Sequence, residues 1–412
     1  MKPAHLVPLW PALLAACSSG APPAREALPT ADVRDSAGIT IVENPAPGTA
    51  FDGLWRVAGE PSVSIGKVTG DPLYEFTRVD GAARLSDGGF VVVDLTGASV
   101  RIFDPTGVFV RSLGGRGEGP GEFNMPAFIG LDGGDTVVVS DASQRRITRY
   151  SADGSSARTA PIRGDLPLYP VRAGVLSDGA VIAHTPGHEA PGEEYDNVLQ
   201  RAPITWASVR TDGSTGVVFG TIPGGEASIG RSRTGPDFWF TYTRSIPFAK
   251  EPAAAASRDR LYLGTADTFE ILVFDQDGSL TRIIRMDHPL RPVTEDLKEA
   301  LLDAALDRQT DPSGEAGVRT YYRDAYYPDF LPAYRSFRAD ALGYLWVQGY
   351  RPSWEGPPIW TVFDPEGRTV ARLAMPDGLT VTDIGGDYVL GVERDEMDVQ
   401  FLRLYGLSRG EP

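Results

Sequence analysis

Two histidines and three glutamates lie close together in the segment HTPGHEAPGEE, which spans residues 184–194. A helix would place His184 and His188 on one face, where two imidazoles could bind a metal such as zinc. Pro186 and Gly187 stand between them, and both residue types disfavour a helix. We therefore interpret the segment as a solvated loop and keep metal binding by His184 and His188 as the alternative.

Two carboxylates, Asp94 and Asp141, occupy equivalent positions in two similar stretches, at the same distance before Asp104 and Ser151. Buried polar groups in proteins are satisfied by hydrogen bonds. We therefore expect both carboxylates to accept bonds from neighbouring backbone. The alternative is that they face a central channel and help to hold a divalent metal there; no other cofactor is predicted.

Motifs for covalent catalysis and phosphate binding are not found. The sequence contains no Gly-x-Ser-x-Gly nucleophile motif. The glycine-rich segment GGRGEGPGEF, residues 114–123, lacks the strand–loop–helix context that a phosphate loop requires. We interpret it as a tight connector between two structural repeats.

A group of aromatic and arginine side chains indicates binding more strongly than these motifs indicate catalysis, because such residues carry much of the binding energy at interfaces. They fall in segments that interrupt the repeats described below. The predicted ligand-binding residues are Trp239, Tyr242, Arg244, Tyr322, Arg323, Arg351 and Trp354. The alternative is that these side chains only pack the inserted segments onto the scaffold.

The scaffold is indicated by a repeating pattern of short apolar runs and turns. The runs FVVVD, VRIFD and VFVRSL are separated by turns at residues 86–89 and 104–107, which is the signature of antiparallel strands. The first turn occurs six times in all, each time before a strand-like run, and the second occurs five times, returning as YSADG, VRTDG, FDQDG and FDPEG. Small sheets that repeat in this way are typical of a β-propeller, so we predict an all-β, six-bladed β-propeller.

The missing outer strand of the last blade is predicted near the N-terminus. The segment at residues 62–76 parallels residues 110–123, and it aligns Ile65 with Leu113. We expect it to pair with residues 399–405 and close the ring, which would leave no open sheet edge. The predicted divisions are a signal peptide at 1–16, a flexible tether at 17–38 and the propeller at 39–407. An insertion at about 286–335 includes one helix, capped by Thr294 and running to about Arg308.

The long inserted segments are all predicted to lie on one face of the disc. If the strands of each blade are lettered a to d from the centre outward, every recognised a–b and c–d turn is short. The long segments are b–c loops (184–203 and 348–358) or d–a loops (114–126, 223–250 and 286–335). These two kinds of loop share a face, and loops on a rigid scaffold commonly carry binding sites.

Charge and cysteine usage bear on location and partners. The net charge is −16, which argues against nucleic acid as a partner. The only cysteine, Cys17, follows Leu14-Ala15-Ala16, and this short motif resembles the lipobox of bacterial lipoproteins, in which the cysteine is lipidated. An ordinary secretory signal or a chance apolar N-terminus is the alternative.

The segment GRGEGPGEF, with its flanks LSDGGFVVVD and FDPTGVFVRSLG, resembles the bacterial six-bladed β-propeller lipoprotein family, which is NHL-repeat-like. The resemblance covers about residues 39–407. It implies the fold and a place in the cell envelope, and it supplies no catalytic residues. Ser18, directly after Cys17, resembles the outer-membrane sorting pattern of lipoproteins, so we expect the anchor to lie in the outer membrane.

From these observations we expect a monomeric, non-enzymatic binding module for a peptide, glycan or protein partner. One alternative is a metal-dependent hydrolase or lactonase, similar to the six-bladed gluconolactonases. A third is a structural or assembly protein that acts through the rim of the disc.

Overall fold

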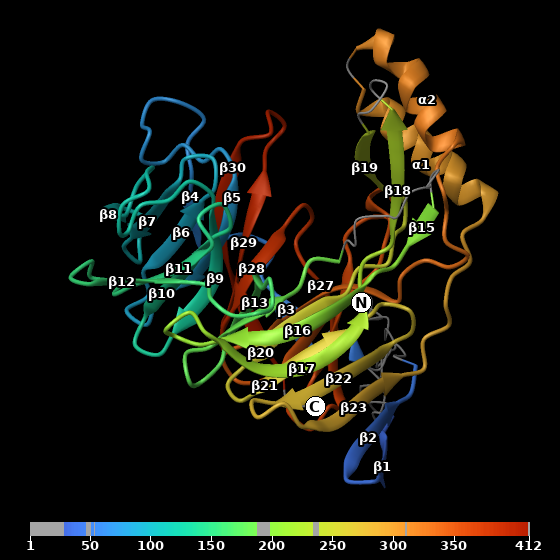
Figure 1. Cartoon of the computed structure of the whole chain (residues 1–412), viewed down its shortest axis with the longest axis horizontal. Coiled ribbons are helices and arrows are strands. Elements are labelled where there is room, and N and C mark those ends of the chain that lie inside the picture. The colour runs from blue at the N-terminus through green and yellow to red at the C-terminus, as the bar shows by residue number, and fades with distance from the viewer. Residues whose placement is uncertain are drawn as a thin grey trace, which may run out of the picture.

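The computed structural model describes residues 29–46, 51–52, 54–187, 198–233, 239–309 and 311–410. Six sheets are arranged as blades around a central axis, and a smaller sheet with two helices stands off the disc that they form (Figure 1). The inner strands of successive blades contact one another around the full ring, including the first and the last. The six-bladed propeller is therefore confirmed. No helix among the described residues is long and apolar enough to cross a bilayer.

The first three blades follow in chain order, each with its innermost strand first. Blade one is made of β5 (Val79–Arg84), β6 (Phe90–Asp94), β7 (Ser99–Phe103) and β8 (Phe109–Leu113). Blade two is made of β9 (Pro126–Asp132), β10 (Thr136–Asp141), β11 (Arg146–Tyr150) and β12 (Ala157–Pro161). Blade three is made of β13 (Tyr169–Val175), β14 (Val181–His184), β16 (Pro203–Val209) and β17 (Thr215–Pro223).

The last three blades continue the same order. Blade four is made of β20 (Ala253–Ser257), β21 (Arg260–Gly264), β22 (Glu270–Asp275) and β23 (Leu280–Met286). Blade five is made of β24 (Tyr334–Ala339), β25 (Leu345–Gly349), β26 (Ile359–Phe363) and β27 (Thr369–Ala374). Blade six is made of β28 (Thr380–Ile384), β29 (Tyr388–Arg394) and β30 (Gln400–Arg409), and it lacks an outer strand from its own part of the chain.

N-terminal strands complete blade six. β4 (Val63–Ile65) pairs antiparallel with β30, placing Ile65 opposite Leu402 as the repeat alignment predicts. The predicted ring closure is thus confirmed. β3 (Trp55–Val57) extends the contact by pairing with the C-terminal end of β30, so two separate strands hold the ring shut.

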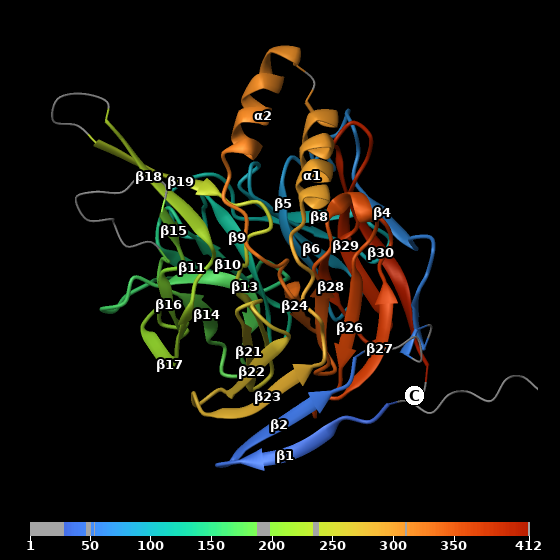
Figure 2. The same cartoon turned by 90° about the vertical axis from the view of Figure 1, so that its right-hand side faces the viewer.

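A second N-terminal element, a hairpin, lies on the outside of blade four (Figure 2). β1 (Asp32–Ser36) pairs with β2 (Ile39–Asn44), and β2 runs parallel to β23. The tether predicted over 17–38 is therefore wrong at its C-terminal end, because Asp32–Ser36 is a strand; residues 17–28 lie outside the described residues. Asn44 fixes the hairpin, since its side chain bonds to backbone of Arg285, Gly367 and Thr369 on two blades.

The core lies between the faces of neighbouring blades. All five residues of β6 are buried, as expected for a strand covered on both sides. Val91 and Val93 pack toward Val137 and Val139 of blade two, while Phe90 packs toward Leu402 of blade six. Each blade thus supplies one face to each neighbour, so the blades depend on one another for burial.

We call the structure that stands off the disc the arm: the sheet β15–β18–β19 together with α1 and α2 (Figure 1). Its elements are β15 (Val198–Gln200), β18 (Ala227–Arg233), β19 (Trp239–Ser245), α1 (Glu295–Asp307) and α2 (Glu315–Arg323), with short 3₁₀ turns at Pro312–Gly314 and Ser353–Glu355 nearby in the inserted segments. The predicted cap is confirmed, because the Thr294 side chain accepts a bond from the Leu297 amide. α2 was not predicted. Its aromatic residues have modest helix propensity, and it is stabilised by contact with α1 and by Glu315 and Arg323 at its ends.

Candidate functional site

The inserted segments meet on one face of the disc. β15, from the b–c loop of blade three, pairs with β18, from the d–a insertion that follows the same blade. Phe248, Leu297 and Leu331 form a small apolar cluster with Tyr350 and Trp354, which joins three different insertions. These contacts bring together the insertions at 184–203, 223–250, 286–335 and 348–358, as predicted, while the place of 114–126 beside them stays a prediction.

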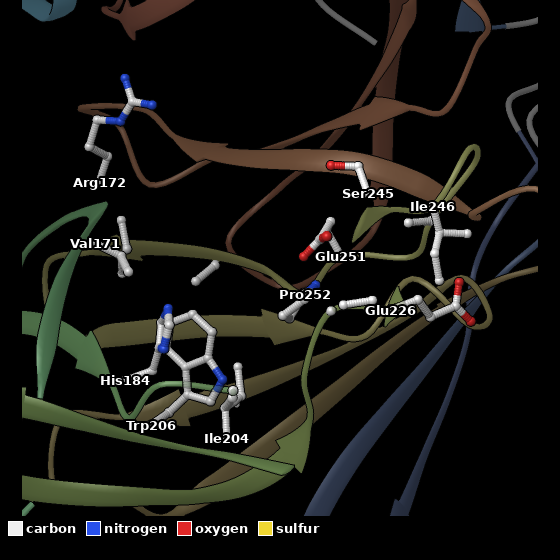
Figure 3. Close-up of a pocket in the computed structure, with 16 residues that line it drawn as sticks. Val171, Arg172, His184, Ile204, Trp206, Glu226, Ser245, Ile246, Glu251 and Pro252 are labelled. Carbon is white, nitrogen blue, oxygen red and sulfur yellow. The ribbon is translucent and has the colours of Figure 1, made fainter. Parts of the chain in front are cut away.

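A cavity of about 470 Å³ lies at the foot of the arm, between blades three and four. This volume falls in the range of small-molecule binding pockets. Figure 3 shows its labelled wall, which comes from β13, β14, β16 and the segments flanking β18, β19 and β20. The principal lining residues are Val171, Arg172, His184, Ile204, Trp206, Glu226, Ser245, Ile246, Glu251 and Pro252.

One wall is an aromatic pair. The rings of His184 and Trp206 lie 5.0 Å apart between centroids, tilted by 55°. The His184 Nδ1 lies 2.6 Å from the Thr185 carbonyl and donates to it, which in the neutral ring leaves Nε2 as an acceptor. The buried Trp206 Nε1 has no acceptor among the described residues. The wall therefore presents an aromatic surface with hydrogen-bonding capacity that the described protein does not use.

The opposite side carries carboxylates in unequal surroundings. Glu226 is buried, and its side chain accepts a bond of 2.9 Å from the Lys250 backbone amide while its other oxygen lies 3.7 Å from the Lys250 ammonium. Glu251 is exposed as a residue, yet burial and then the charge of Glu226 raise the pKa of its carboxyl, and Arg201 opposes this. The carboxylate of Glu251 would be stabilised most by a ligand that donates hydrogen bonds or carries an amine.

Arg172 brings positive charge to the same cavity from the inner strand of blade three. Its side chain is 52% exposed, and its guanidinium lies 3.7 Å from Asp80 of blade one. The cavity thus combines an aromatic surface, a carboxylate and a guanidinium. This combination can recognise a polar ligand with an apolar face, such as a peptide end or a sugar.

Asp94 and Asp141 have the structural role that was expected. Asp94 accepts bonds from the backbone amides of Thr77, Arg78 and Gly97, and it pairs with Arg101 at 3.5 Å. Asp141 makes the equivalent bonds in blade two, to the amides of Asn124, Met125, Ser143 and Gln144. Burial acts to raise the pKa of Asp141, but these bonds outweigh it and hold the pKa below its usual value. Neither residue lines the channel, so the alternative of a metal site there does not hold for this pair.

The weak metal candidates can be followed only in part. His188 lies outside the described residues, and His184 is placed against Trp206. Within the described ranges, no group of three or more His, Cys, Asp or Glu residues is arranged to hold a metal ion.

The predicted aromatic and arginine residues are dispersed over the arm. Trp239, Tyr242 and Arg244 lie on β19, but their side chains are outside the described residues, as is Cys17. Tyr322 and Arg323 lie on α2, where Arg323 is exposed and pairs with the adjacent Asp324.

The loop of blade five gives a similar result. Arg351 is exposed and donates to the Pro357 carbonyl at 3.2 Å, while the Trp354 ring packs 6.4 Å from that of Phe248. Tyr322, Arg323, Arg351 and Trp354 do not line the cavity. For Trp354 the packing alternative was therefore the better interpretation.

Sequence reasoning missed the residues that do line the cavity. Arg172 could have been noticed as a charge within an inner strand, YPVRAGV, whose counterpart in blade two, PAFIGLD, is apolar at its centre. Glu226 and Glu251 flank the inserted hairpin, and only the closure of that hairpin brings them together.

Comparison with known proteins agrees with the architecture. A family model described as a 6-bladed beta-propeller matches residues 81–171. The chain is a six-bladed β-propeller. The fold implied by the resemblance in blades one and two is thereby confirmed. No curated protein matches the sequence.

Solved structures with similar folds share little sequence. A Bacteroides fragilis protein described as exported is 12% identical, with 90% of this chain and 100% of that chain covered and a TM-score of 0.47. A member of the DUF4221 family from Bacteroides vulgatus is 8% identical, with coverages of 86% and 99% and a TM-score of 0.47. A gluconolactonase from Xanthomonas campestris is 15% identical, with coverages of 86% and 100% and a TM-score of 0.37.

Proposed function

We propose that this propeller is a monomeric binding module of the bacterial cell envelope that takes the end of a peptide or glycan, free or displayed by a protein partner, into the cavity at the foot of the arm. The observation that carries the proposal is the placement of the His184–Trp206 pair opposite Glu251 in one cavity. The aromatic pair offers a surface for a ring or a sugar face, and the carboxylate accepts the ligand's N–H or O–H groups.

Binding is favoured over metal-dependent hydrolysis by the side chains that the cavity provides. A lactonase-type mechanism needs several oxygen or nitrogen ligands around one ion. Among the described residues of the cavity, Glu226 is already paired with Lys250, and of the imidazole nitrogens only Nε2 of His184 is left for a ligand. One imidazole nitrogen and one carboxylate are fewer ligands than such an ion needs. Glu251 is left as a lone carboxylate, which suits recognition of a ligand better than coordination of a metal.

The test uses arrays of immobilised peptides and glycans, probed with the labelled protein. Glu251→Gln removes the charge but keeps the size of the side chain, and no hydrogen bond within the described protein depends on it. We expect the affinity for bound probes to fall by about tenfold or more, the loss typical of a charged hydrogen bond. The matched control is Glu299→Gln on the exposed side of α1, which should leave binding unchanged.

The outcome that contradicts the proposal is binding that survives Glu251→Gln unchanged, or no binding to either array. Thermal unfolding of both variants should match that of the parent protein, which separates a lost contact from a lost fold. Divalent metal added to the arrays should have no effect on binding. A dependence on metal, or turnover of a bound lactone, would favour the hydrolase instead.

We also propose that the protein is anchored to the outer membrane by lipid on Cys17. The support is the motif Leu14-Ala15-Ala16-Cys17. Cys17→Ala should move the protein from the membrane fraction to the soluble envelope fraction, and Ser18→Ala is the control for a change at the adjacent position. Unchanged membrane association of Cys17→Ala would contradict the anchor, whatever the cavity binds.

A further inference from the structure

We propose that the central channel of the propeller binds a small oxyanion, a carboxylate or phosphate group, between Arg172 and Arg338. The channel is a cavity of about 350 Å³ lined by the inner strands of all six blades. It is separate from the cavity of the proposed function, although Arg172 and Ala173 lie at the boundary and line both.

The charge of the channel is opposite to that of the protein. The chain as a whole has a net charge of −16. Four arginines line the channel together with three aspartates: Arg84, Arg172, Arg258 and Arg338, and Asp80, Asp340 and Asp383. One of the aspartates, Asp340, is neutralised from outside this set by Arg409, whose guanidinium lies 2.8 Å away. Arg84 is paired in the same way with Asp387 from outside this set, at 3.8 Å. Three arginines then stand against two aspartates, so the channel holds a small excess of positive charge within an acidic protein.

Arg338 is the centre of this positive charge. Its guanidinium donates to the carbonyls of Phe337 at 2.9 Å and Val381 at 3.4 Å, and no carboxylate of the described residues forms an ion pair with it. Burial, and then repulsion from Arg172, lowers its pKa to about 10, and the charge of Asp383 partly opposes this, so the group stays protonated at neutral pH. A partly buried cation whose hydrogen bonds go only to neutral carbonyls is stabilised by an anion.

The two remaining aspartates do not fill this need. Asp383 accepts bonds from the Arg84 amide at 3.0 Å and the Tyr388 hydroxyl at 2.7 Å, and burial raises its pKa. Asp80 is shared between Arg172 at 3.7 Å and the Phe128 amide at 2.8 Å. The buried Arg84 Nε also has no acceptor among the described residues.

The chemistry of the ligand follows from the guanidinium group. Its planar N–H groups match the oxygens of a carboxylate or a phosphate in pairs, and exclusion of water strengthens such bonds. The cavity has room for a phosphate or for a small di- or tricarboxylate. Because the inner strands of all the blades surround the ligand, its binding should stabilise the whole ring.

The test measures binding of inorganic phosphate and of citrate to the folded chain by calorimetry, with sodium chloride at matched ionic strength as the reference. We expect heat of binding and a rise in the unfolding temperature with at least one of the two anions, beyond that in chloride. Stronger binding of phosphate would identify a phosphate-bearing ligand, and stronger binding of citrate would identify a carboxylate.

Three arginine variants show where the anion binds. Arg172→Gln and Arg338→Gln should each weaken the affinity by about tenfold or more, as expected for a lost charged hydrogen bond. Arg319→Gln, on the exposed side of α2, is the matched control and should bind as the parent does. If Arg338→Gln does not fold, Arg172→Gln carries the test, because its side chain is half exposed.

The proposal is overturned if the parent protein responds to phosphate and citrate no more than to chloride. It is also overturned if Arg172→Gln retains the full response. Glu251→Gln should not change anion binding, so failure of the channel site and failure of the proposed function can be told apart.

Discussion

The disc and the arm differ in how much of their structure is buried. In the disc each blade packs both faces against its neighbours, and the inner strands contact one another around a closed ring. The arm has one small sheet and two helices, and α2 has no buried residue. A compact apolar cluster around Phe248, Leu297 and Leu331 attaches it to the disc. The comparison indicates that stability resides in the ring, while the arm adds the walls of the candidate site at little structural cost.

Removal of the strands that close the ring should have the largest effect on folding. Deleting residues 29–66 removes the closing strands β3 and β4 together with the hairpin β1–β2, and it leaves the edges of β30 and β23 unpaired. We expect an aggregating or unfolded protein, since open sheet edges and exposed blade faces favour association. Size-exclusion chromatography and circular dichroism provide the measurement.

The control for this deletion is a shorter one. Removing residues 29–38 takes away only β1, whose five residues are all exposed and which pairs with β2 alone. It should leave the fold and the unfolding temperature nearly unchanged. A folded, monomeric product of the longer deletion would show that ring closure is not what holds the disc.

The second prediction concerns a buried ion pair in the disc. Arg409 donates to Asp340, whose side chain is fully buried, and stacks 4.5 Å from the Trp55 ring. Arg409→Ala should lower the free energy of unfolding by about 3 kcal/mol, because it leaves a buried carboxylate without its cation. Chemical denaturation would measure this.

The matched control for Arg409→Ala is Arg394→Ala. Arg394 ends β29 and pairs with the exposed Asp398 in the turn that leads to β30, so its loss should cost less than about 1 kcal/mol. Equal costs for the two variants would show that burial of the Asp340–Arg409 pair adds nothing to the stability of the disc.

The third prediction concerns the cluster that attaches the arm to the disc. Trp354 is half-buried and packs against Phe248, so Trp354→Ala should remove part of the attachment cluster. The local cost should be about 1–2 kcal/mol, below that of a fully buried tryptophan. Hydrogen exchange should accelerate in α1 and around Phe248 but not in the blades. Uniform acceleration would show that arm and disc unfold as one unit.

The difference between disc and arm also explains which parts of the structure could be predicted from the sequence. Strands such as FVVVD are buried on both faces and bounded by turns that need glycine, as at Gly107 with φ of 86°, so local pattern and tertiary position agree. The register of Ile65 could be predicted because a repeat provides an internal template.

The candidate site had no such template. Arg172, Trp206 and Glu251 belong to different blades or connections, and only the closure of the ring and the fold of one hairpin bring them together. The parallel pairing of β2 with β23 was also beyond prediction, because no equivalent strand exists in the other blades. Trp354 was predicted as a binding residue and instead packs, because an aromatic residue in an insertion can serve packing as readily as binding.

The smallest predicted effect lies at the junction of the two regions, where the chain leaves β23 toward α1. His288 stacks on Phe269 of blade four, with 5.6 Å between ring centroids. Burial lowers the pKa of His288 below its usual value, and Asp287 partly opposes this. The folded state therefore disfavours the imidazolium more than the unfolded state does. Stability from this residue is complete above the unfolded pKa of about 6.5 and decreases as the pH falls through that value toward the lower folded pKa.

Because His288 is exposed to solvent over much of its surface, this decrease should be slight. His288→Gln should flatten the slope of the unfolding free energy between about pH 7 and about pH 5, and NMR titration of the ring should give a pKa below 6.5. An imidazole that titrates at or above that value would show that packing of the junction against blade four does not desolvate the ring. The boundary between disc and arm would then begin at Met286, at the end of β23, rather than after His288.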